Sequence, residues 1–126
     1  MSAAAETPLG QICIQVHPAR APGLDIARLA EACEAAARRT PGIRGFGVSE
    51  GEDDGAYVNL VFAAEDPLQA WPPLWAALRA LAEFGTLLPD CCLGMCTGEQ
   101  GWDDYRLLHH FDPDVALGEP GDGCGV

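Results

Sequence analysis

Hydrophobic and polar residues alternate in the stretch QICIQVH, which spans residues 11–17. Side chains of an extended chain point alternately to its two faces, so this period of two predicts a half-buried strand. Its buried face would carry Ile12, Ile14 and Val16. Its other face would carry Gln11, Cys13, Gln15 and His17.

The spacing of hydrophobic residues changes to three and four between Leu24 and Arg39, which predicts an amphipathic helix. Asp25 near its start and Arg38 with Arg39 near its end would complement the helix dipole. The segment Thr40-Pro41-Gly42 is a stop signal. The inward stripe would begin with Leu24 or Ile26 and continue with Leu29, Ala30, Cys33 and Ala37.

Two strands joined as a hairpin are expected next, over residues 42–50 and 56–64. The turn between them, GEDDG at residues 51–55, contains Asp54-Gly55, a strong hairpin signal. In the second strand Val58, Leu60 and Phe62 would lie on the face opposite to that of Tyr57, Asn59 and Val61.

A second helical region is expected to begin at Asp66, with Pro67 in the first turn, where proline is tolerated. The pair Pro72-Pro73 is expected to interrupt a single long helix. The pattern therefore predicts a short turn up to Trp71 and then a helix over residues 73–84. That helix would direct Leu74, Trp75, Leu78 and Leu81 inward. A last strand is expected over residues 90–98, DCCLGMCTG.

The order strand, helix, strand, strand, helix, strand resembles the ferredoxin-like fold. This resemblance implies an α+β domain with a four-stranded antiparallel sheet, both helices on one face, and the first strand between the third and fourth. It covers residues 11–98 and contains no functional motif, so it implies nothing about chemistry. The open sheet face would need to be covered by the C-terminal segment, a second subunit or a ligand.

The chain is expected to form one domain over residues 10–116, with an added C-terminal element after the fourth strand. Residues 1–9 are expected to be a mobile leader, and residues 117–126 a flexible Gly-rich tail. The added element, residues 102–111, fits either an extra strand or a short helix.

The excess of acidic over basic residues indicates which classes of partner are expected. The chain has 19 acidic residues and seven basic ones, all of them Arg, and a formal net charge of -12. Such a charge repels phosphate backbones and anionic membranes, so no nucleic acid and no membrane partner is expected. It suits a cationic protein partner, or simply good solubility.

Six cysteines are present, but no basic segment followed by an apolar run opens the chain. Cys13 and Cys33 fall within a predicted strand and helix, where a free thiol acts as a small hydrophobe. We therefore expect a cytoplasmic protein with reduced thiols. No apolar run approaches the roughly 20 residues of a membrane span.

Chemistry-bearing residues crowd into GWDDYRLLHHFDPD, residues 101–114. A ligand or metal site built from Cys92, Cys96, His109 and His110 is one hypothesis. Its weakness is the spacing CCxxxC within a strand, where neighbours point to opposite faces and buried thiols are the simpler interpretation. A catalytic site combining Cys96, His109 and Asp112 is another hypothesis.

The preferred prediction is a non-enzymatic, acidic, protein-binding module, such as an immunity-type inhibitor of a cationic toxin or enzyme. No catalytic residue, metal or cofactor is predicted for it. Partner binding is assigned to Trp102, Asp103, Asp104, Tyr105 and Asp112. One alternative is a homodimer through the open sheet face that binds a ligand or metal through Cys, His and Asp groups. The other is a cysteine-dependent enzyme.

Overall fold

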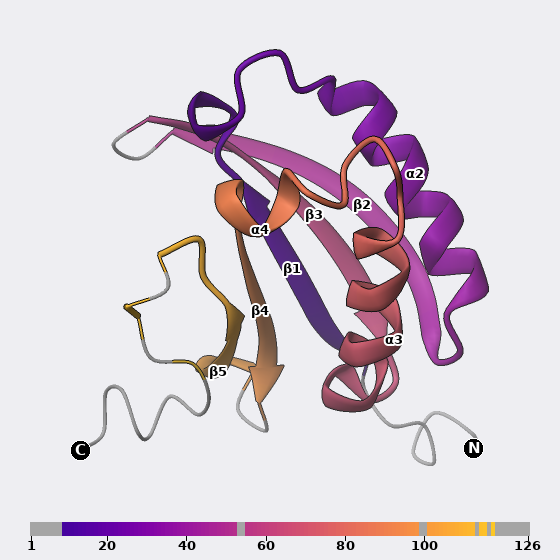
Figure 1. Cartoon of the computed structure of the whole chain (residues 1–126). Coiled ribbons are helices and arrows are strands. Elements are labelled where there is room, and N and C mark those ends of the chain that lie inside the picture. Colours follow the sequence, from indigo (N-terminus) through magenta and orange to yellow (C-terminus); the bar gives the residue numbers. More distant parts are fainter. Residues whose placement is uncertain (1–8, 53–54, 99–100, 113, 116, 118–126) are drawn as a thin grey trace, which may run out of the picture.

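The protein has an α+β fold in which two helices, α2 (Ile26–Arg39) and α3 (Pro67–Arg79), pack on one face of an antiparallel sheet (Figure 1). The computed structural model describes residues 9–52, 55–98, 101–112, 114, 115 and 117. Most of the expected leader and tail, and Asp54 of the hairpin turn, therefore lie outside the described residues. No helix in the described part of the chain is long and apolar enough to cross a membrane.

The sheet has five strands, in the order β2-β3-β1-β4-β5. The predicted four-stranded ferredoxin-like arrangement is therefore not the one observed, because the chain continues beyond β4 and adds a fifth strand to the sheet. This added strand pairs with the edge of β4 and satisfies backbone groups that an edge leaves unpaired. The strands are β1 (Gly10–Val16), β2 (Ile43–Glu52), β3 (Ala56–Ala64), β4 (Cys92–Gly98) and β5 (Gly101–His109).

The alternation seen in the sequence decides which side chains enter the core. Ile12, Ile14 and Val16 of β1 are fully buried, and the β1–β3 register places them opposite Phe62, Leu60 and Val58. Strands β2 and β3 pair with each other and form the expected hairpin. Residues 101–109 form a strand, which settles the choice between strand and helix for this part of the chain.

Both long helices begin at an aspartate that caps them. Asp25 accepts a hydrogen bond from the backbone N–H of Arg28, and Asp66 accepts one from that of Gln69. The chain also has two short helical segments, which are the 3-10 helix η1 (Pro18–Arg20) after β1 and the single turn α4 (Leu88–Cys91) before β4. The turn α4 takes up residues that the pattern had assigned to the last strand.

The prediction that Pro72-Pro73 would interrupt the second helix is wrong, because α3 runs continuously through both prolines. A proline removes the N–H that would bond to the carbonyl four residues earlier, here those of Leu68 and Gln69. Both of these residues and both prolines are exposed, so water can bond to the freed carbonyls. The helix ends at Arg79 rather than at Phe84, and turns follow it.

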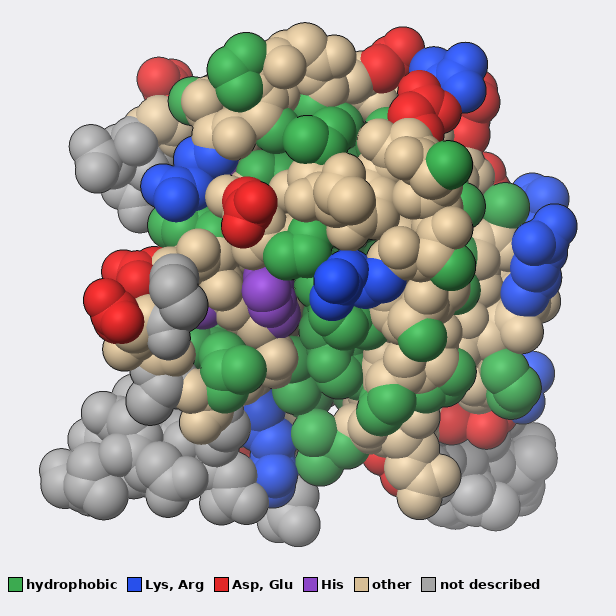
Figure 2. Space-filling view, viewed as in Figure 1, with side chains coloured by type: hydrophobic (Ala, Val, Ile, Leu, Met, Phe, Trp, Pro, Cys, Tyr) green, Lys and Arg blue, Asp and Glu red, His purple; other side chains and the backbone are tan. Residues whose placement is uncertain are grey.

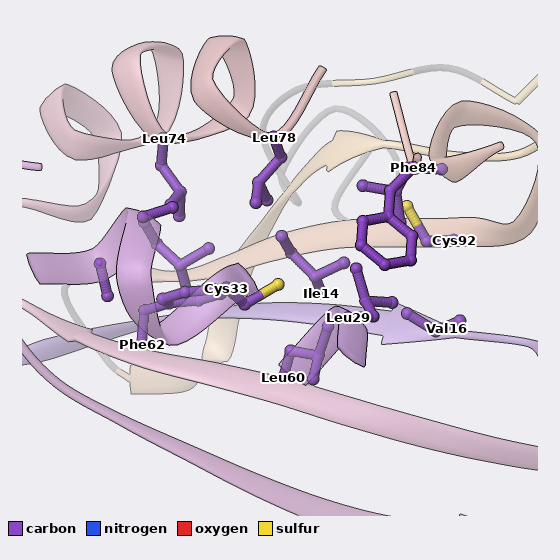
Figure 3. Packing of buried hydrophobic residues seen from close by; sticks show 14 of the residues in the cluster. Ile14, Val16, Leu29, Cys33, Leu60, Phe62, Leu74, Leu78, Phe84 and Cys92 are labelled. Carbon is purple, nitrogen blue, oxygen red and sulfur yellow. The ribbon is translucent and has the colours of Figure 1, made fainter. Parts of the chain in front are cut away.

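The core lies between the two helices and the inner face of the sheet (Figure 3). Large side chains from both layers are fully buried there, among them Leu29, Leu60, Phe62, Leu74 and Leu78. The thiols of Cys33 and Cys92 are buried among them, which is the environment expected for cysteines that act as small hydrophobes.

Candidate functional site

A hollow of about 720 Å³ opens at the end of the sheet where β1 begins and α3 starts. It forms where segments far apart in the sequence meet: the start of β1, the link from β3 to α3, the end of β4 and the start of β5. Its lining residues include Leu9, Gln11, Asp66, Leu68, Trp102 and Arg106. A concave site of this size is large enough to receive several side chains of a partner.

Exposed hydrophobic side chains gather at this hollow. Of the seven large hydrophobic side chains exposed in the described part of the chain, three line it: Leu9 (47% exposed), Leu68 (42%) and Trp102 (42%). Single exposed hydrophobic residues are ordinary on a protein surface, whereas a group around a concavity indicates an interaction site.

The indole of Trp102 is held in place although much of it is exposed. Its Nε1–H donates a hydrogen bond of 3.1 Å to Oε1 of Gln11, which joins β5 to β1 across the end of β4. The bond satisfies the one polar group of the ring and leaves its apolar surface free. A large aromatic ring fixed in this way loses little conformational freedom on binding, which is typical of an interface anchor.

Charged groups of both signs line the hollow. Glu65 pairs with Arg44 of β2, and Asp66 caps α3. Arg106 reaches the hollow from β5. A partner would therefore meet apolar surface bordered by carboxylates that already have intramolecular partners.

The structure brings together four of the five residues assigned to partner binding. Trp102, Asp103, Asp104 and Tyr105 follow one another on β5, where Asp103 is exposed and Tyr105 is 37% exposed. Asp112 lies beyond the other end of this strand, and its Oδ1 accepts a hydrogen bond from the backbone N–H of Asp114. Asp112 therefore belongs to a turn. Of the five residues, only Trp102 lines the hollow.

The residues of the suggested Cys/His site point to different surroundings. Cys92 and Cys96 are fully buried, and four residues along a strand separate them by roughly 13 Å. His109 lies 2.8 Å from the carbonyl oxygen of Pro89, which can only accept, so its Nε2 donates. The Nδ1 of His110 accepts from the backbone N–H of Asp112. No group of three or more His, Cys, Asp or Glu side chains within the described residues is arranged to hold a metal ion.

Burial makes the cysteines poor acids. It raises the pKa of Cys13 and of Cys91 to about 11, and that of Cys33 to about 12. The pKa of Cys92 and of Cys96 is raised as well, first of all by burial. These groups remain thiols at neutral pH, whereas a nucleophilic cysteine acts as a thiolate.

A polar cluster on the open sheet face was not recognised from the sequence. Hydrogen bonds join His17, Gln15, Asn59 and Ser49 across three strands. At the His17 end, the ring of Phe111 packs edge-on at 5.3 Å, and the Arg20 guanidinium lies 3.9 Å above Phe111. Burial, followed by the charges of Arg20 and His110, lowers the pKa of His17. Strand alternation placed Gln15 and Asn59 on this face, but only the strand register pairs them.

Comparison with known proteins finds no family model, no curated protein and no solved structure that matches this chain. Its function is therefore inferred from the chemistry of its own surface. The hollow at Trp102 is the concave feature where exposed hydrophobic side chains gather around one of the residues predicted for partner binding.

Proposed function

We propose that this protein is a non-enzymatic binding module whose partner is a cationic protein, as in an immunity-type inhibitor of a cationic toxin or enzyme. The observation that carries the proposal is the gathering of Leu9, Leu68 and Trp102 around one hollow. In protein interfaces a few large side chains in a water-excluding centre contribute most of the affinity. The formal net charge of -12 would raise the rate of encounter with a partner of opposite charge.

The hydrophobic hollow and the net negative charge have separate roles in this proposal. A hydrophobic side chain of the partner enters the hollow and packs on the exposed face of the Trp102 indole. Basic side chains of the partner lie at the rim, where Asp103 beside Trp102 is exposed. Rim charges mainly affect the association rate and its salt dependence, whereas the buried anchor mainly affects dissociation.

The two other functions considered from the sequence receive no specific support from the described residues. A cysteine-dependent enzyme needs a thiolate near neutral pH, and burial raises the pKa of the described thiols. A metal or ligand site would need Cys92, Cys96, His109 and His110 to converge, and their hydrogen bonds and burial place them in separate surroundings.

Site-specific photo-crosslinking in an extract of the source organism tests the proposal. A benzophenone amino acid replaces Leu68 at the hollow, and in a control protein it replaces Val48, which is 48% exposed on β2 at the far edge of the sheet. We expect a basic protein to be crosslinked from position 68 and not from position 48. Adding Trp102→Ala should abolish that product.

Salt gives an independent readout of the charge component. Raising the ionic strength from about 50 mM to 300 mM shortens the range of electrostatic attraction, so the yield from position 68 should fall several-fold. Identical products from both positions, or a yield unaffected by Trp102→Ala, would overturn the proposal.

A further inference from the structure

Strand register assigns no charged side chain of β1 to β4 to the face of the sheet that points away from α2 and α3, here called the open face. Arg44 lies at a bulge at the start of β2 and pairs with Glu65. Strand register and alternation assign the residues of the open face. On β1 and β3 these residues are Gln11, Cys13, Gln15, Tyr57, Asn59, Val61 and Ala63. Those of the flanking strands are Gly45, Gly47, Ser49 and Gly51 on β2, and Leu93, Met95 and Thr97 on β4.

This neutrality contrasts with the rest of the chain, which has 19 acidic and seven basic residues. Glu50 and Glu52 of β2 pair with Val58 and Ala56 and so belong to the opposite face. The basic side chain of Arg106 on β5 likewise faces the helix side, opposite Cys96. A cationic partner would find no carboxylate to pair with on the β1 to β4 part of the open face, so this part does not suit the partner proposed for the hollow.

The centre of the open face is apolar. Cys13 is only 7% exposed although no helix covers it, because half-buried Val61 and Met95 flank it on the neighbouring strands. On β5, Leu107 continues this strip next to Met95. Among the described residues, the C-terminal segment does not lie across this strip: β5 extends the sheet, and Phe111 packs on His17 at one end.

A row of polar side chains lies beside the apolar strip. His17 Nε2 donates to Gln15 Oε1 (2.9 Å), Gln15 Nε2 to Asn59 Oδ1 (3.2 Å), and Asn59 Nδ2 to the Ser49 hydroxyl (3.4 Å). Carboxamides and hydroxyls each donate and accept hydrogen bonds. Such groups can pair with their own copies across a two-fold axis, where like charges would repel.

We propose that the open face binds a second copy of this chain, so that two sheets pack face to face in a symmetric dimer. On β1 to β4 this face lets two chains of charge -12 approach without placing carboxylates against carboxylates. The small residues Gly45 and Gly47 keep part of the β2 side of the face flat, which favours close contact between sheets.

The size of the face fits a dimer of modest affinity. Four strands about 4.8 Å apart and seven residues of about 3.3 Å each give roughly 440 Å² per copy for the uncharged part, and β5 adds further area. Specific interfaces bury at least about 600 Å² of surface per partner. The flat estimate is a lower bound, because side chains that project from the sheet add accessible surface. The dimer is therefore expected to dissociate on dilution.

Asn59→Asp tests the proposal by adding one charge to the face without changing its shape. The new carboxylate still accepts from Gln15, and the Ser49 hydroxyl can donate to it, so the monomer keeps its row of hydrogen bonds. The matched control is Gln69→Glu, which adds the same charge at an exposed position on α3. Circular dichroism confirms that both variants are folded.

Sedimentation velocity over a hundredfold range of concentration is the readout. We expect the wild-type chain and Gln69→Glu to form dimers with the same dissociation constant, and Asn59→Asp to raise that constant at least tenfold. A monomeric wild-type chain at several hundred micromolar, or a dimer equally stable in Asn59→Asp, would overturn the proposal.

Photo-crosslinking of the purified protein locates the interface. A benzophenone amino acid at Val61 should produce a covalent dimer, whereas the same group at Val48, on the helix side of β2, should not. Crosslinked dimer from Val48 alone would place the contact elsewhere and contradict the proposal.

Discussion

The indole of Trp71 on α3 lies directly against the backbone of Gly94 on β4. A Cβ at position 94 would come within 2.7 Å of Cη2 of that ring. Trp71 stacks on Trp75 at 5.0 Å, and Trp75 in turn lies 4.9 Å from the ring of His109. This row of rings joins α3 to β4 and β5. Figure 2 shows hydrophobic side chains and histidine gathered in the middle of this side of the molecule.

Gly94→Ala should destabilise the protein, because the added methyl group forces the stacked indoles to shift. Overpacking of this kind costs about 1–3 kcal/mol in free energy of unfolding. The control is Gly47→Ala, where a Cβ meets nothing within 4 Å, and which should stay within about 0.5 kcal/mol of the wild type. Urea denaturation followed by tryptophan fluorescence measures both. Equal stability of the two variants would contradict the observed contact.

Stability and partner binding should separate along α3. Leu74 is fully buried, so Leu74→Ala should lower the free energy of unfolding by about 2–5 kcal/mol. Leu68 is 42% exposed at the hollow, so Leu68→Ala should change stability by less than about 1 kcal/mol but weaken partner capture. Thermal unfolding measures the first effect, and the yield of crosslinked partner from a benzophenone amino acid at Leu9, which also lines the hollow, measures the second. A Leu68→Ala protein that unfolds as easily as Leu74→Ala would show that this side chain is structural.

The thiols should be unreactive in the native protein. Because Cys124 lies outside the described residues, the measurement uses a Cys124→Ser chain. Burial raises the pKa of Cys13 and Cys91 to about 11, so alkylation at pH 8 should be far slower than for a free thiol and should accelerate only on unfolding. One thiol that reacts rapidly in the folded chain would favour the cysteine-dependent enzyme.

Stability should fall as the pH is lowered from 7 to 5. In the folded chain the pKa of His17 lies below its usual value of 6.5, first because of burial and then because of Arg20 and His110. The unfolded chain therefore binds a proton below about pH 6.5 before the folded chain does, and the equilibrium shifts toward unfolding. Above that pH both states are neutral, and this contribution to stability is fully present.

His17→Gln provides the comparison for this pH effect, since glutamine keeps a donor for Gln15 but does not titrate. The decrease in free energy of unfolding between pH 7 and pH 5 should be smaller in this variant than in the wild type. Denaturation curves at both pH values give the difference. An equal decrease in the two proteins would show that His17 has its ordinary pKa when folded.

Local patterns predicted most of the secondary structure. Alternation in residues 11–17 and 56–64 identified two strands and the faces of their side chains, and Asp25 and Asp66 marked the starts of both long helices. The same reasoning was wrong at Pro72-Pro73, where the tertiary structure overrides the low helix propensity of proline. Packing of the Leu74 and Leu78 side chains in the core, together with exposed carbonyls on the opposite side, sustains a helix through both prolines.

The candidate site was only partly visible in the sequence. Trp102, Asp103 and Tyr105 stood out by composition, but Leu9 and Leu68 carry no signal of their own. They become part of a site because the start of β1 and the start of α3 lie beside β5. The row from His17 to Ser49 depends in the same way on the pairing of β1, β3 and β2.

The sequence by itself determined the alternating faces, the helix caps, the acidic character and the thiols available for burial, because each follows from near neighbours along the chain or from composition. Only the tertiary structure decided that residues 101–109 extend the sheet, that Trp102 bonds to Gln11, and that the open face is uncharged on β1 to β4. These features join residues up to 91 positions apart. Such contacts arise from strand pairing and packing of the whole chain, which no local periodicity encodes.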